Sequence, residues 1–193
     1  RRRHTRLQGD WSSDVCSSDL DTSTSLFNTG KWDSLTIKIL YRLNLKTLGS
    51  IRYNLSERTS AQLKNAGGMR LIENQELSNK IADYWVRSEN LKEYNHFVED
   101  LKFKAREKSY SIFDQKFYKD VTLGIVSDEA KLMTEDPAIL TEFANRLNHI
   151  NNSLKKVFLP GIDKHYKKAI ELMTLLKKEY KLDEAKKADA IVF

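Results

Sequence analysis

The chain has 193 residues, of which 31% are charged and 40% are hydrophobic, and its formal net charge is +6 at pH 7. This length is sufficient for one domain with a core of its own, and a solubilising surface explains the modest basic excess without any polyanionic ligand. No apolar run reaches the roughly 20 residues that cross a bilayer as a helix. The only cysteine is Cys16, which excludes an intramolecular disulfide and a multi-cysteine metal site.

The first twenty residues, RRRHTRLQGDWSSDVCSSDL, lack the hydrophobic pattern of a folded element. Their arginines are typical of a basic arm, but no apolar stretch follows that would complete a signal peptide. Two blocks in one reading frame, RRRHTR and DWSSDVCSSDL, resemble the translation of a common sequencing-library adapter. We therefore interpret residues 1–20 as an artefactual segment that does not join the core, and expect the natural N-terminus to be missing.

Two short helices are predicted in the N-terminal third. Residues 21–31 are polar and are predicted to form a flexible lead. From residue 32 to 48, apolar residues recur near helical spacing, and Gly49 suits the end of that helix. Ser56 is a candidate N-cap for a short helix that Gly67 and Gly68 would stop. The predicted apolar positions of these two helices are Leu35, Ile39, Leu43 and Leu48, then Ala61, Leu63 and Ala66.

A much longer helix is predicted from Asn74, a suitable N-cap, to about Asp114. Its apolar residues alternate at gaps of three and four, a heptad-like pattern, and Ser88 fills the one break. We therefore expect these positions to face a partner helix: Leu77, Ile81, Tyr84, Leu91, Tyr94, Val98, Leu101 and Ala105. The following residues 117–135 are predicted to form an irregular connector with one helical turn.

Asp136 followed by Pro137 is typical of a helix start. A first apolar stripe runs to the sequence LPG at 159–161, and a second continues beyond it in nearly the same phase. One helix kinked at Pro160 and two helices joined by a tight turn are both compatible with this pattern, and the preserved phase favours the kink. The stripes consist of Ile139, Phe143, Leu147, Ile150, Leu154 and Phe158, then Ile162, Tyr166, Ala169, Met173, Leu176 and Tyr180.

These elements predict an all-α fold. Two long helical segments would form an antiparallel, coiled-coil-like hairpin, and the shorter N-terminal helices would pack on it. A single helical domain is expected over residues 32–182, followed by a C-terminal tail over residues 183–193.

The run QLKNAGGMRLI at 62–72, followed by Ile81 and Tyr84, resembles a group of membrane-anchored helical proteins of Bacteroidota. The runs DPAILTEFANRL at 136–147 and LLKKEYKL at 175–182 are similar to the C-terminal half of the same group. The resemblance covers most of residues 35–182. It implies a transmembrane helix upstream, absent from this chain, and a membrane-associated parent protein of the cell envelope, while the present piece would be soluble. It implies no activity, cofactor or substrate.

Few residues of the sequence suggest a catalytic or ligand-binding role. Gly67 and Gly68 lack the spacing of a phosphate-binding loop and suit a left-handed helix end, beside which Arg70 could bind an anion or pair with Glu73. Glu93 and His96 have the Glu-x-x-His spacing of di-iron helices, but such sites need a second copy and two further glutamates. His149 and His165 have no acidic partner at ligand spacing. We therefore predict no catalytic, cofactor-binding or metal-binding residues, and no cofactor.

The C-terminal part is rich in lysine, which is compatible with a surface for nucleic acid or anionic lipid headgroups. Interleaved acidic residues favour a solvated helix face instead. The lysines are Lys155, Lys156, Lys164, Lys167, Lys168, Lys177, Lys178, Lys181, Lys186 and Lys187.

The sequence therefore favours a non-enzymatic helical domain of a membrane-anchored protein that associates with itself or another protein through helix faces. The alternatives are a lysine-rich nucleic-acid-binding protein and, less favoured, a metal-dependent helical-bundle enzyme.

Overall fold

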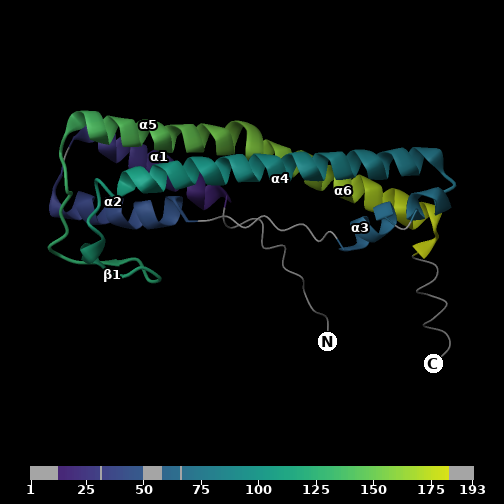
Figure 1. The fold of residues 1–193 in the computed structure, drawn as a ribbon, viewed down its shortest axis with the longest axis horizontal. Helices are drawn as coiled ribbons and strands as arrows, with labels where there is room; N and C mark the ends of the chain where they lie inside the picture. Colours follow the sequence, from purple (N-terminus) through teal and green to yellow (C-terminus); the bar gives the residue numbers. More distant parts are fainter. Residues whose placement is uncertain (1–12, 31, 50–57, 66, 183–193) are drawn as a thin grey trace, which may run out of the picture. The chain divides into compact units, whose positions relative to one another are not determined.

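A computed structural model describes residues 13–30, 32–49, 58–65 and 67–182 of the chain (Figure 1). The described residues are mostly helical, and two short strands form the only sheet among them. The chain divides into two compact units. The first unit comprises residues 1–52 and 95–159, and the second comprises residues 53–94 and 160–193.

The first unit begins with helices α1 (Ser13–Thr29) and α2 (Ser34–Thr47). The α2 helix starts at Asp33, whose carboxylate accepts a hydrogen bond from the Thr36 amide at 2.7 Å. Such a cap satisfies one of the amides that have no partner in the first helical turn. The helix predicted at 32–48 is therefore confirmed, and the predicted positions Leu43 and Leu48 are buried. The prediction was wrong for Leu35, which is exposed, and it missed the buried residues Ile37, Leu40 and Tyr41.

The α1 helix corrects two predictions about the N-terminal residues. Residues 21–31 were expected to be a flexible lead and residues 1–20 to stay outside the core, but α1 includes 13–29, and Leu20 and Phe27 are buried. Leu20, Thr24 and Phe27 recur at helical spacing on the face that packs against α2 and α5 (Pro137–Ser153). Serine, threonine and aspartate are weak helix formers. Packing on the neighbouring helices therefore stabilises this helix more than local preference does.

The carbonyl groups at the C-terminal end of α2 accept hydrogen bonds from two cationic side chains of α4 (Gln75–Ser109). The Lys102 ammonium donates a hydrogen bond to the Gly49 carbonyl at 2.9 Å, and the Arg106 guanidinium donates one to the Leu48 carbonyl. Carbonyl groups at a helix C-terminus lack intrahelical donors and carry partial negative charge, so cations stabilise them. This contact explains why the Lys102 side chain is buried although it is charged.

Four aromatic rings form the centre of the first unit. Phe27 of α1 and Phe143 of α5 lie edge to face at 5.3 Å between centroids, as do Tyr41 of α2 and Phe113 at 4.9 Å. Phe113 also contacts Phe143 at 6.0 Å. The Tyr41 hydroxyl donates a hydrogen bond to the Lys131 carbonyl and accepts one from the Asp114 amide. This aromatic cluster joins α1, α2, α5 and the connector that follows α4.

That connector is more regular than predicted. A helical turn, η2 (Gln115–Phe117), lies just before the predicted connector, with only Phe117 inside it. Strands β1 (Tyr118–Asp120) and β2 (Ile125–Val126) then pair antiparallel, which the sequence did not predict. Gly124 supplies the left-handed conformation of the hairpin turn, with φ +63°. The β2 strand packs against α2, so tertiary contact supports a pairing too short to be stable alone.

The second unit contains α3 (Arg58–Asn65), η1 (Gly68–Leu71), the first part of α4 and α6 (Leu159–Glu179) from Pro160 onwards. The predicted left-handed joint after α3 is confirmed, because Gly67 has φ +68°. The candidate cap Ser56 and the predicted apolar position Ala66 lie outside the described residues.

The predicted cap of α4 is confirmed: the Asn74 side chain accepts a hydrogen bond from the Leu77 amide at 3.1 Å. The α4 helix ends at Ser109, however, earlier than the predicted Asp114.

The chain stays helical across Pro160. The α5 helix is capped by Asp136, continues through the π-helical segment η3 (Leu154–Phe158), and joins α6, giving 43 helical residues in total. In η3 the Leu159 amide donates to the Leu154 carbonyl, five residues back. Proline has no amide hydrogen and its ring crowds the carbonyl four residues earlier, so a widened turn just before it relieves both problems. The continuous helix of the favoured interpretation is therefore confirmed over two helices joined by a turn, and the irregularity that precedes Pro160 is a π-helical segment.

The long helices run antiparallel within each unit. In the first unit, Lys108 of α4 pairs with Glu142 of α5 at 2.5 Å. In the second unit, Asn74, the cap residue of α4, donates a hydrogen bond to Glu179 of α6 at 3.1 Å. In both units, residues later in α4 therefore meet residues earlier in the partner helix. The predicted all-α fold, a long helical hairpin with shorter N-terminal helices packed on it, is confirmed.

Candidate functional site

The contact between α4 and α6 in the second unit brings three polar residues together. His165 of α6 is only 6% exposed, and its ring stacks on Tyr84 of α4 at 4.3 Å between centroids. The Ser88 hydroxyl lies 3.2 Å from His165 Nε2. Gly161 allows the close approach, because a Cβ there would come within 3.0 Å of the Leu91 side chain. Tyr84, Ser88 and His165 are named the seam triad below.

The hydrogen bonds of the seam triad assign its protons. The Ser88 hydroxyl donates its only proton to the Tyr84 carbonyl at 2.9 Å. His165 Nε2 must therefore carry a proton and donate it to Ser88, which leaves Nδ1 as an acceptor. Within the described residues this buried Nδ1 has no partner. Ser88 is thus a structural hydrogen-bonding group and is not arranged as a nucleophile activated by a base, because its proton faces a carbonyl.

Protonation of His165 is opposed by its surroundings. Burial lowers the pKa of His165 from its ordinary value of 6.5, and the positive charge of Arg87 lowers it further. The imidazole is consequently neutral at physiological pH, and α6 packs on α4 around an uncharged ring.

We expect the stability of the second unit to fall with acidification. As pH drops below the ordinary histidine pKa, the unfolded chain binds a proton that folded His165 resists, so the folded state loses stability until pH passes the lower folded pKa. Hydrogen exchange of the α6 amides can be followed from about pH 8 to about pH 5. The opening of α6 should increase toward acidic pH more in the wild type than in His165→Phe. The exposed His149 provides a matched control, since His149→Phe should keep the wild-type pH dependence. Identical profiles for wild type and His165→Phe would contradict this role.

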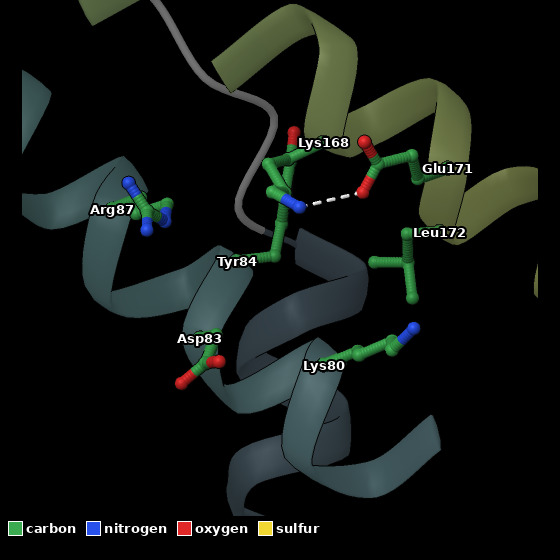
Figure 2. A pocket seen from close by; sticks show the side chains of 7 residues that line it. All are labelled: Lys80, Asp83, Tyr84, Arg87, Lys168, Glu171 and Leu172. Carbon is green, nitrogen blue, oxygen red and sulfur yellow. Dashed lines mark hydrogen bonds and ion pairs between the residues drawn. The ribbon is translucent and has the colours of Figure 1, made fainter. Parts of the chain in front are cut away.

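A hollow of about 200 Å³ lies beside the seam triad, with Tyr84 in its lining (Figure 2). Its charged lining includes Lys168 and Glu171 of α6, which form an ion pair at 2.6 Å. The hydrogen bond from Lys168 lowers the pKa of Glu171. Figure 2 shows that Arg87 and Asp83 point away from this pair, so the lining charges do not converge on one ligand position. The lining consists of Lys80, Asp83, Tyr84, Arg87, Lys168, Glu171 and Leu172.

The residues considered for metal binding do not come together. Glu93 and His96 are exposed on α4, and the His149 ring lies 6.2 Å from that of Phe97. Across the described ranges, no group of three or more His, Cys, Asp or Glu side chains could hold a metal ion. Arg70 is exposed in η1, where its backbone amide bonds to the Gly67 carbonyl at 2.9 Å.

The outer surface of α6 exposes a row of large apolar side chains. Tyr166, Ile170, Met173 and Tyr180 are 49%, 42%, 54% and 48% exposed, respectively. They are spaced by four, three and seven residues, which places them along one side of the helix. These four residues are named the α6 face below.

The α6 face corrects the predicted stripe of this helix. The sequence placed Tyr166, Met173 and Tyr180 in the hairpin seam, but the structure buries His165 there, beside the half-buried Leu172 and Leu176. Apolar residues cover a wide arc of the α6 surface. The α4 helix packs against only part of this arc, so the remaining apolar side chains stay exposed. The one signal that could have located the seam triad is Ser88, the polar break in the stripe of α4, because a polar residue at a buried position requires a hydrogen-bonding partner.

The lysines of α6 are partly neutralised by the acidic residues of the same helix. Lys167 pairs with Asp163 at 2.7 Å and Lys168 with Glu171, while Glu179 accepts the hydrogen bond from Asn74. Each acidic side chain of α6 is therefore already engaged. Lys164, Lys178 and Lys181 are exposed, and none forms an ion pair within the described part of the chain.

None of the helices in the described residues is both long and apolar enough to cross a membrane. Comparisons with protein-family models, curated protein sequences and solved structures returned no match.

Proposed function

We propose that this chain is a non-enzymatic helical interaction domain of a membrane-anchored protein, and that it associates through the α6 face. The observation that carries the proposal is the row of four large, half-exposed apolar side chains on one helix side. Contiguous exposed apolar surface is costly in water and typically marks a binding surface. The membrane-anchored part of the proposal rests on the resemblance of the 62–72 run to the Bacteroidota group.

Two further observations support association over catalysis. The Ser88 hydroxyl donates to the Tyr84 carbonyl of its own helix and accepts from His165 Nε2 of α6, so this contact holds the two helices together. Around the hollow, Lys168 and Glu171 pair with one another along α6, while Asp83 and Arg87 point away from that pair (Figure 2). The sequence favours a second copy or another protein as the partner of such a helix face.

We expect the purified chain to self-associate reversibly as its concentration rises, because pairing of two α6 faces removes apolar surface from water. Sedimentation equilibrium should show that the double variant Ile170→Gln/Met173→Gln raises the dissociation constant at least about tenfold, the effect of losing about 1.4 kcal/mol. Val86→Gln is the matched control, since Val86 is 60% exposed on α4 but lies outside the α6 face. A double variant that self-associates as tightly as the wild type would overturn the proposal.

A further inference from the structure

One segment of this chain, the C-terminal tail, has the composition needed to cover the α6 face. The tail, residues 183–193, lies outside the described residues, and its sequence is DEAKKADAIVF. After a polar stretch it contains three large apolar residues in succession, Ile191, Val192 and Phe193. Contact between these residues and the α6 face removes apolar surface from water on both sides.

The end of α6 redirects the chain before the tail begins. Lys181 has φ 47°, the left-handed conformation that commonly follows the last turn of a helix. The chain therefore does not continue along the axis of α6. The tail starts at the same end of the helix as Tyr180, the last residue of the α6 face.

The tail is long enough to run back along the whole α6 face. From Tyr180 to Tyr166 the face extends for about 21 Å, at about 1.5 Å per helical residue. The tail reaches about 36 Å in extended conformation, at about 3.3 Å per residue. The difference leaves several residues for the reversal of direction, so the apolar residues of the tail can lie beside the centre of the face.

Covalent connection favours the tail over a second copy as the occupant. A segment joined by a short linker acts at a local concentration in the millimolar range, well above the concentration of a second copy in dilute solution. A contact with a dissociation constant of about 1 mM would therefore cover about half of the faces. Pairing of two copies needs two free faces, so the dissociation constant of self-association would rise about fourfold.

We propose that residues 188–193 of the tail dock on the α6 face of the same chain and compete there with a second copy. The proposal rests on the proposed function, because it adds regulation to the same surface. In an extended segment Ile191 and Phe193 point to the same side, since side chains alternate along it. That side packs against Ile170 and Met173, and release of the tail uncovers the face.

Docking is tested by NMR of the full 193-residue chain, labelled with carbon-13 at its methionine methyl groups and kept dilute enough to be monomeric. The chain has three methionines, so the variant Met173→Gln identifies the Met173 signal. We expect nuclear Overhauser contacts between the Phe193 ring and the Met173 methyl group. The Met173 signal should shift in Ile191→Gln/Phe193→Gln, named the tail variant below.

The matched control for the tail variant is Leu71→Gln. Leu71 is 82% exposed in η1, which belongs to the same unit but lies outside the α6 face. This substitution also replaces an apolar side chain with a polar one, yet it should leave the Met173 signal unchanged. Far-UV circular dichroism establishes that each variant is folded.

Competition is tested by sedimentation equilibrium. The tail variant should self-associate about fourfold more tightly than the wild type, whereas Leu71→Gln should not. Adding Ile170→Gln/Met173→Gln to the tail variant should then weaken self-association at least about tenfold, because only the contact with the second copy is left to lose.

The two failures are distinguishable. A tail variant that self-associates no more tightly than the wild type, or whose Met173 signal is unchanged, overturns tail docking and leaves the proposed function standing. Substitutions at Ile170 and Met173 that leave the self-association of the tail variant unchanged overturn the proposed function, and the competition with it.

Discussion

Replacing Phe113 with alanine should destabilise the first unit by about 3–5 kcal/mol, the cost typical of removing a large aromatic side chain from a core. Phe113 is almost fully buried and contacts the rings of Phe27, Tyr41 and Phe143, so its loss leaves a cavity between three elements. Those elements cannot collapse into it without breaking the hydrogen bonds of Tyr41 to the connector. Urea unfolding, followed by circular dichroism, measures the change.

The matched control for Phe113 is Phe103→Ala. Phe103 lies on α4 in the same unit but is 53% exposed, so its removal should cost less than about 1 kcal/mol. A similar cost for the two variants would show that the aromatic cluster does not form the centre of the first unit.

Replacing Leu20 with alanine should destabilise the same unit by about 2–5 kcal/mol. Leu20 is fully buried on the side of α1 that packs against α2 and α5. Because the sequence placed residues 1–20 outside the core, this variant tests the N-terminal half of α1 directly. Deleting residues 1–20 should lower the thermal midpoint for the same reason.

Leu35→Ala is the control for Leu20, since Leu35 is 71% exposed on α2. It should change the free energy of unfolding by less than about 0.5 kcal/mol. If Leu20→Ala proves as harmless as Leu35→Ala, then α1 is not packed as the structure describes, and the original expectation for residues 1–20 is restored.

Local signals in the sequence were sufficient to predict most helix boundaries. Asn74 and Asp136 each cap the helix that follows, because their side-chain oxygens reach amides two or three residues ahead whatever the rest of the chain does. Gly67 adopts the left-handed conformation that ends α3, because glycine alone has no Cβ to oppose it. These interactions span only a few residues, so they can be read without a tertiary structure.

The stripe of α4 was also predictable, since its apolar residues form one narrow row that leaves a single side to bury. Ser88 was visible as a break in that row, but its partner was not. His165 lies 77 residues away, and only the antiparallel register of α4 and α6 brings the two side chains to 3.2 Å. The candidate site therefore depends on a pairing that no local pattern specifies.

The sequence by itself determined that this protein is helical, where most of its helices start, and which side of α4 is buried. Tertiary structure alone decided that the serine-rich α1 is a helix, that β1 and β2 pair, and that α6 buries His165 and exposes Tyr166. The physical reason is the same in each case. Where local preference is weak, or where apolar residues surround more of a helix than one neighbour can cover, the partner that packs there selects the conformation and the buried face.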